Sequence, residues 1–293
     1  MGREADLNIK NSIDFLGFIA TQFPIVAFTG VTYDPKPHGI PSKNNLIEET
    51  SAIDLAELFL EGNYPYFGSI WLNRENMFDK ETLAIGGIVY VWPGEIETTI
   101  NEKRIYLQGL TFEGESIKRL SKMLPIFPMA ILGIDFDCPN SEPHKEQIKN
   151  ILNQLNINIY EPYLFDSGGS FHLAFKTLIN PKNIPYHYGS LIEIFSTLPQ
   201  YGDLYIFKEI ADKLKGNWDN PDEIRKVCDL IFNKICHYDS PEEGKVPFIL
   251  DLRWMAHSLL ELLDFLETKD GSAAFLRISD KSGEGIVPFR VNL

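Results

Sequence analysis

The run of residues 129–137, Met-Ala-Ile-Leu-Gly-Ile-Asp-Phe-Asp, constrains the fold more than any other part of the sequence. An apolar run of this length that ends in acids predicts a buried β-strand whose tip reaches a cleft. Side chains two residues apart on a strand share a face, so Asp135 and Asp137 are expected to present two carboxylates on one side. Such a pair suits Mg²⁺ or Mn²⁺, which prefer oxygen ligands and keep positions for waters and phosphates. The alternative is a strand that simply runs out into solvent.

The composition is that of an ordinary globular protein. Of the 293 residues, 44% are hydrophobic and 23% charged, which excludes the disordered, collagenous and coiled-coil classes. The length predicts roughly two domains, and a change of pattern near residue 114 divides them into an N-terminal α/β module at 1–115, forming part of the cleft, and a core at 116–293; one continuous domain is the alternative. The net charge of −14 argues against a general nucleic-acid coat, but leaves room for a local groove or a metal-bridged nucleotide.

The sequence also predicts a cytoplasmic protein that does not enter a membrane. Three cysteines, an odd and sparse set, fit a reducing compartment better than a disulfide scaffold. The first ten residues lack the apolar stretch of a secretory signal. The early apolar run at 15–31 is interrupted by polar residues and is too short for a membrane span.

The remaining pattern mixes strands and helices. Strands are expected at 157–165, 172–176, 246–252, 273–279 and 286–293, and helices at 142–156, 187–197, 203–216 and 220–236. In the first of these helices Ser141 is the expected cap, and the expected apolar face consists of Ile148, Ile151, Leu152 and Leu155. The hairpin-like strand runs favour an antiparallel sheet over a doubly wound parallel one.

Two further segments carry residues suited to chemistry. The Ser-Gly-Gly-Ser sequence at 167–170 predicts a tight turn whose amides and hydroxyls can hold an anion such as phosphate, and His172 follows it. The alternative is a plain hairpin turn with a hydrogen-bonded histidine. Asp251 ends another apolar run and is a candidate to complete a carboxylate triad. Alternatively, it is the N-cap of a helix that begins at Leu252.

Taken in order, the three segments resemble the three sequence motifs of the archaeo-eukaryotic primase superfamily. In that family the first motif supplies two metal-binding acids, which match Asp135 and Asp137 here. The second supplies a serine and a histidine that hold the incoming nucleotide, which match Ser170 and His172. The third supplies another acid, which matches Asp251. The resemblance therefore implies a metal site of three aspartates beside a nucleotide-binding turn.

The resemblance covers residues 125–290 and also implies how the triphosphate is held. In the family, an arginine on a strand after the third motif is followed by a serine and a basic residue, which match Arg277, Ser279 and Lys281. Ser167, at the start of the turn, joins the expected nucleotide-binding group. The implied fold is α+β, a primase-polymerase-like core with a mostly antiparallel, RRM-like sheet flanked by helices.

The function that the resemblance implies is metal-dependent nucleotidyl transfer, as in DNA primases and polymerases. Nucleotides from nucleoside triphosphates would be added to a nucleic-acid primer or template, with Mg²⁺ or Mn²⁺ as cofactor. The expected partners are a nucleoside triphosphate, single-stranded or primed DNA and, through the N-terminal module, a protein. Two other classes stay open: a non-catalytic primase-fold accessory protein in replication or defence, and another Asp-x-Asp metal-dependent enzyme such as a nuclease or a glycosyltransferase.

Overall fold

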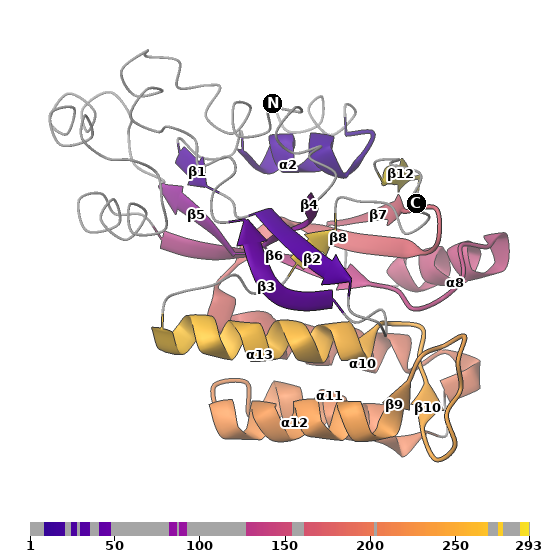
Figure 1. Cartoon of the computed structure of the whole chain (residues 1–293). Coiled ribbons are helices and arrows are strands. Elements are labelled where there is room, and N and C mark those ends of the chain that lie inside the picture. Colours follow the sequence, from indigo (N-terminus) through magenta and orange to yellow (C-terminus); the bar gives the residue numbers. More distant parts are fainter. Residues whose placement is uncertain are drawn as a thin grey trace, which may run out of the picture.

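The described part of the chain forms an α+β fold in which antiparallel sheets lie against helices, as the sequence predicts (Figure 1). The computed structural model describes residues 9–20, 25–27, 30–35, 41–47, 82–86, 88–92, 127–153, 161–201, 204–268, 275–277 and 288–292. The expected domain boundary at residue 115 lies outside these ranges. Among the helices that are described, none combines the length and the apolar composition needed to cross a bilayer.

The larger sheet has six strands, each antiparallel to its neighbours. Their order across the sheet is β1 (Ile25–Ala27), β5 (Ile88–Trp92), β6 (Phe127–Asp135), β8 (Phe171–Ile179), β7 (Pro162–Asp166) and β12 (Phe289–Val291). β6 and β8 therefore occupy the middle of the sheet. The run that the sequence marks as a buried strand is β6, and residues 130–136 are all buried.

A split β-α-β unit forms the centre of this sheet. β6 leads into helix α8 (Glu142–Leu152), which returns the chain to β7, and a tight turn then brings β8 between β6 and β7. Since β8 is antiparallel to both, β6 and β7 run parallel. α8 begins after Ser141, as expected, and buries Ile148, Ile151 and Leu152. Leu155, expected on the same face, lies outside the described residues.

A second, four-stranded sheet lies beside the first, and its strands are also antiparallel. Its order is β11 (Phe275–Arg277), β4 (Thr82–Gly86), β2 (Gly30–Pro35) and β3 (Pro41–Ile47). β11 contacts both β6 and β8. The strand that follows the third motif therefore lies against the strands that carry the first and second motifs.

Helices cover the sheet on two sides. They are α2 (Ser12–Ala20), α10 (Ile184–Phe195), α11 (Tyr205–Gly216), α12 (Pro221–Lys234) and α13 (Leu252–Thr268). In Figure 1, α10 and α13 lie between the six-stranded sheet and the outer pair α11 and α12, while α2 lies on the opposite side of the sheet. The expected helices are thus confirmed, with ends displaced by no more than four residues.

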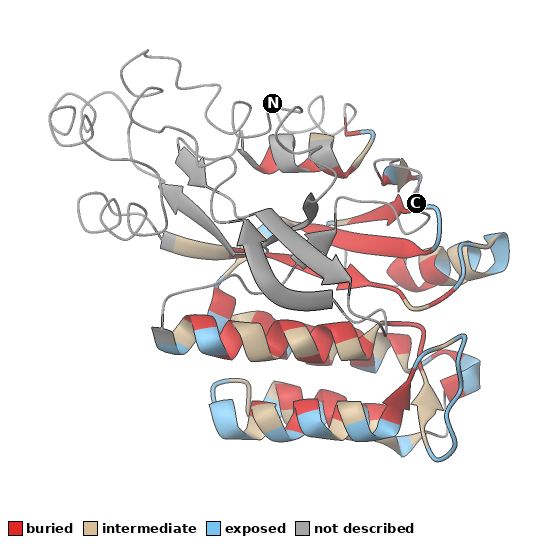
Figure 2. Cartoon of the chain, viewed as in Figure 1, coloured by how far each residue is buried: buried red, intermediate tan, exposed pale blue. Residues whose placement is uncertain are grey.

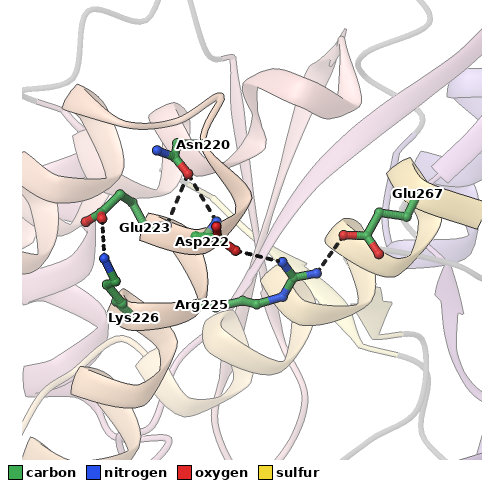
Figure 3. A network of polar contacts seen from close by, with 6 residues as sticks. All are labelled: Asn220, Asp222, Glu223, Arg225, Lys226 and Glu267. Carbon is green, nitrogen blue, oxygen red and sulfur yellow. Dashed lines mark hydrogen bonds and ion pairs between the residues drawn. The ribbon is translucent and has the colours of Figure 1, made fainter.

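Polar side chains cap α12 and connect it to α13 (Figure 3). The side-chain oxygen of Asn220 accepts hydrogen bonds from the backbone amides of Asp222 and Glu223, which satisfies two donors of the first turn. Arg225 contacts Asp222 and reaches Glu267 of α13 at 2.6 Å. These ion pairs are exposed and add little to stability, but they join the start of α12 to the end of α13.

The two faces of β6 have different surroundings. Leu132, Ile134 and Phe136 belong to one hydrophobic cluster with residues of α8, α10, α11, α12 and α13. Figure 2 shows this burial concentrated in the central strands and on the inner faces of the helices. Alternate residues of a strand point the other way, so Asp135 faces away from this helical core. His172, which lies directly opposite Asp135 on β8, shares that face.

Candidate functional site

The end of β6 pairs with a segment from much later in the chain. Phe136 and Leu250 form an antiparallel bridge, and the backbone amide of Asp251 donates to the carbonyl of Asp135 at 2.9 Å. One residue further along this register, the backbone of Asp251 lies opposite that of Asp135. The fold therefore brings together the acids of the first and third motifs.

His172 lies on the other side of Asp135, on the neighbouring strand β8. The two residues are directly opposite in the ladder between β6 and β8. Nδ1 of His172 lies 3.0 Å from Oδ1 of Asp135, and their side chains are only 2% and 4% exposed. A buried carboxylate needs such a partner, because its desolvation is otherwise costly. His172, Asp135 and Asp251 thus form a row across three adjacent backbone segments.

Asp137 is held differently from Asp135, because β6 ends at Asp135. Its Oδ2 accepts a hydrogen bond from the backbone amide of Tyr238 at 2.9 Å and lies 3.1 Å from Nδ1 of His237. Tyr238 and His237 follow β9 (Ile235–Cys236), a short strand paired in parallel with β10 (Val246–Pro247). The orientation of this carboxylate therefore depends on the segment after β9 and not on the alternation of β6 alone.

Asp251 also caps helix α13. Its Oδ1 accepts a hydrogen bond from the backbone amide of Trp254 at 2.8 Å, and the helix begins at Leu252. The N-cap role that the sequence offered as an alternative is therefore confirmed. The same residue combines this capping bond with a position opposite Asp135, so a structural role and a place in the row coexist.

The turn at 167–170 joins β7 and β8, as the sequence predicts, and Gly168 adopts a positive φ of 82° in it. Both serine hydroxyls donate to backbone carbonyls. Ser167 Oγ bonds the carbonyl of Ser170 at 2.8 Å, and Ser170 Oγ bonds that of Phe136 at 2.6 Å. These bonds brace the turn against the end of β6. The hydroxyl protons expected to contact phosphate are therefore used within the protein in this arrangement.

Sequence reasoning missed two residues that shape the turn, Asn140 and Asp166. Oδ1 of Asp166 accepts from Nδ2 of Asn140 at 2.7 Å and from the amide of Gly168 at 2.8 Å. The backbone amide of Asn140 also donates to the carbonyl of Gly169 at 3.2 Å. The sequence contains a signal for the role of Asp166, because an aspartate commonly accepts a hydrogen bond from the backbone amide two residues further on, here that of Gly168. The segment after β6 is thus attached to the turn before β8.

The expected triphosphate-binding segment is only partly described. Arg277 is the last residue of β11 and pairs with Ala84 of β4. Since β11 contacts β6, this strand lies beside the one that carries Asp135. Ser279 and Lys281 lie outside the described residues. Their contact with a triphosphate stays a prediction, as does that of Arg277.

Carboxylate oxygens are the ligands that a hard divalent cation prefers, and the segments that carry Asp135 and Asp251 pair with each other. Asp135 and Asp251 offer carboxylate oxygens from directly opposite positions, where two like charges repel each other unless a cation lies between them. Among the described residues, no three His, Cys, Asp or Glu side chains gather closely enough to enclose a metal by themselves. Tyr238 donates its backbone amide to Asp137. Partial burial raises the pKa of its phenol, with smaller contributions from Cys138 and Asp239, so the phenol stays neutral at physiological pH.

Removing the hydroxyl of Ser170 tests the bracing of the turn. Ser170→Ala leaves the buried carbonyl of Phe136 without this donor, so we expect the free energy of unfolding to fall by about 1–3 kcal/mol. Urea unfolding followed by circular dichroism measures the change. Ser196→Ala is the matched control, because the Ser196 hydroxyl also bonds a carbonyl, that of Glu193, but in an exposed position. Equal effects of the two substitutions would contradict a bracing role.

The comparisons with known proteins add no relative to this picture. A scan against protein-family models, a search of curated proteins and a search of solved structures each found no match.

Proposed function

We propose that this chain is a metal-dependent nucleotidyltransferase of the primase-polymerase type, which adds nucleotides from nucleoside triphosphates to a nucleic-acid primer or template. One observation carries the proposal: the pairing of residues 249–251 with the end of β6 puts Asp251 opposite Asp135, while β8 puts His172 opposite Asp135 from the other side. Each of the three motif segments thus contributes one member of the row.

The topology of the larger sheet supports the same proposal. The unit β6-α8-β7-β8, with β8 between β6 and β7, corresponds to the first four elements of the β-α-β-β-α-β pattern of ferredoxin-like and RRM-like folds. Asp135 ends its first strand, Asp137 follows just after it, and the segment that carries Asp251 pairs with that end. An RRM-like, primase-polymerase core is the finer form of the observed α+β fold, and it is part of the proposal.

In this proposal all three acids bind the cation at the end of β6. Asp135 and Asp251 hold the cation from opposite backbone positions, and Asp137 is the third ligand, from the segment just after β6. A divalent cation bound there would activate the attacking 3′-hydroxyl and neutralise charge on the phosphates. His172 lies beside the Asp135 carboxylate, with Nδ1 3.0 Å from Oδ1 of Asp135. The nucleotide contact of His172 is the further role that the sequence resemblance implies.

The remaining nucleotide-binding residues are proposed from the resemblance and from their place in the fold. Ser167 and Ser170 lie in the turn that abuts the end of β6, and Arg277 ends a strand that contacts β6. Ser279 and Lys281 complete the set. The partners are a nucleoside triphosphate and single-stranded or primed DNA. With a net charge of −14, DNA contact has to be local and not spread over the surface. The proposed location is the cytoplasm.

Calorimetry with a non-hydrolysable nucleoside triphosphate, with and without Mn²⁺, tests the proposal. We expect binding at least about tenfold tighter with Mn²⁺, because the cation bridges carboxylates and phosphates through charge-assisted contacts. Extension of a labelled primer on a DNA template then tests transfer itself. Triphosphate binding that is indifferent to the metal, together with no extension, would rule the proposal out.

A second candidate function, a non-catalytic accessory protein with a primase-like fold, has its own supporting observation. Several candidate residues already serve the fold: Ser167 and Ser170 donate to carbonyls, and Asp251 caps α13. A fold that had lost catalysis could retain all three for those roles alone. Binding of primed DNA without metal-dependent triphosphate binding would favour this candidate.

A further inference from the structure

We infer that His237 and the backbone amide of Tyr238 are positioning groups that hold the carboxylate of Asp137 in the orientation needed for metal binding. The inference rests on the proposed function and adds to it two residues that no motif includes. Both donors converge on one oxygen: the Tyr238 amide lies 2.9 Å and His237 Nδ1 lies 3.1 Å from Oδ2. Since a carboxylate only accepts, Nδ1 of His237 carries the proton in this contact.

We call His237 and the backbone amide of Tyr238 the clamp of Asp137. The clamp is needed because the sheet alone does not orient this carboxylate. The backbone of Asp137 is fixed by its amide, which donates to the carbonyl of Ile249 at 2.8 Å. Its side chain, however, lies beyond the last residue of β6 and is 21% exposed, whereas that of Asp135 is 4% exposed. A side chain at a strand end with partial exposure keeps rotamer freedom unless polar partners restrict it. His237 and Tyr238 supply that restriction.

The clamp is itself braced from helix α8. The hydroxyl of Tyr238 lies 3.3 Å from Nε2 of His144, and Nδ1 of His144 lies 2.8 Å from Oγ of Ser141. The rings of His144 and Tyr238 meet edge to face, with centroids 5.4 Å apart. His144 and Ser141 lie at the start of the helix that follows β6. The segment that contains His237 and Tyr238 therefore contacts both Asp137 and the start of α8, a few residues further along the chain.

Outer partners of this kind influence a metal site strongly. Groups that hydrogen-bond a metal-ligating side chain typically contribute 10–100-fold to metal affinity. We therefore expect His237→Ala to weaken Mn²⁺ binding by about 10–100-fold. The stability of the fold should hardly change, because the His237 side chain is 48% exposed. The cause of the weaker binding would be the freed carboxylate and not a damaged core.

The test uses the full chain and Mn²⁺ alone, with binding measured by calorimetry and by the electron paramagnetic resonance signal of free Mn²⁺. His237→Asn is the rescue variant, because an asparagine amide places a donor close to the position of imidazole Nδ1. It should recover most of the affinity lost in His237→Ala. Ser240→Ala is the matched control in the same turn, since its side chain is exposed. It should bind Mn²⁺ like the wild type.

The outcomes separate the inference from the proposed function. If the wild type binds Mn²⁺, and Asp135→Asn abolishes this binding while His237→Ala leaves it unchanged, the positioning role is overturned and the metal site stands. If His237→Asn binds Mn²⁺ as weakly as His237→Ala does, the positioning role is also overturned. A wild type that binds no Mn²⁺ overturns both. Should His237→Ala unfold the chain, His237→Leu, which fills the space without a donor, takes its place.

Discussion

Replacing Asp251 with asparagine is expected to abolish Mn²⁺-dependent binding of a nucleoside triphosphate while leaving the chain folded. Asparagine is as good an N-cap as aspartate, so the bond to the Trp254 amide survives. The negative charge opposite Asp135 is lost. Since loss of an outer partner already costs 10–100-fold in metal affinity, loss of a direct ligand should weaken binding on the order of 100-fold or more. Calorimetry with a non-hydrolysable triphosphate measures it.

Two further variants at the same site separate capping from metal binding. Asp251→Ala removes the cap as well, so its free energy of unfolding should fall by about 1 kcal/mol below that of the asparagine variant. Asp135→Asn should lose Mn²⁺-dependent binding to the same extent as Asp251→Asn, because the two acids face each other across the ladder. Full triphosphate binding by Asp251→Asn would show that this residue only caps the helix.

The largest expected loss of stability comes from Phe207→Ala. Phe207 of α11 is fully buried and stacks on Phe248 with ring centroids 4.0 Å apart, and Tyr201 packs edge-on against both rings. Truncation removes this apolar contact and leaves a cavity that the surrounding helices fill only in part. We expect the free energy of unfolding to fall by about 3–5 kcal/mol, measured by urea denaturation.

Tyr205 provides the matched control on the same helix. It is also a large aromatic residue of α11, but it is 73% exposed. Tyr205→Ala should change the free energy of unfolding by no more than about 0.5 kcal/mol. A loss below about 1 kcal/mol for Phe207→Ala would mean that the cluster around Phe248 does not anchor this part of the core. Because Phe248 precedes the segment that pairs with β6, the same cluster supports the position of Asp251.

Local pattern was enough to predict the elements that carry the site. An uninterrupted apolar run identified β6, and the helical spacing of Ile148, Ile151 and Leu152 identified the buried face of α8. The Ser-Gly-Gly-Ser turn was predictable because glycine permits the positive φ seen at Gly168. In each case the physical cause lies within a few neighbouring residues, so the sequence expresses it directly.

The orientation of the functional side chains could not be predicted in the same way. Alternation along a strand put Asp135 and Asp137 on one face, but it applies only while the strand continues, and β6 ends at Asp135. The partners of Asp137, His237 and Tyr238, come from a distant segment with no motif of its own. The hydroxyl of Ser170 likewise turns to a carbonyl on another strand. These contacts depend on tertiary pairing.

The pairing of Leu250 with Phe136 also indicates when the site forms during synthesis and folding of the chain. A growing chain that has been synthesised as far as β8 already contains both strands of the ladder in which Asp135 and His172 are paired. Asp251 is synthesised only after helices α10, α11 and α12. Closing so long a loop costs entropy before the new contacts repay it, which favours late formation. The two negative charges therefore meet only when most of the fold exists to hold them together.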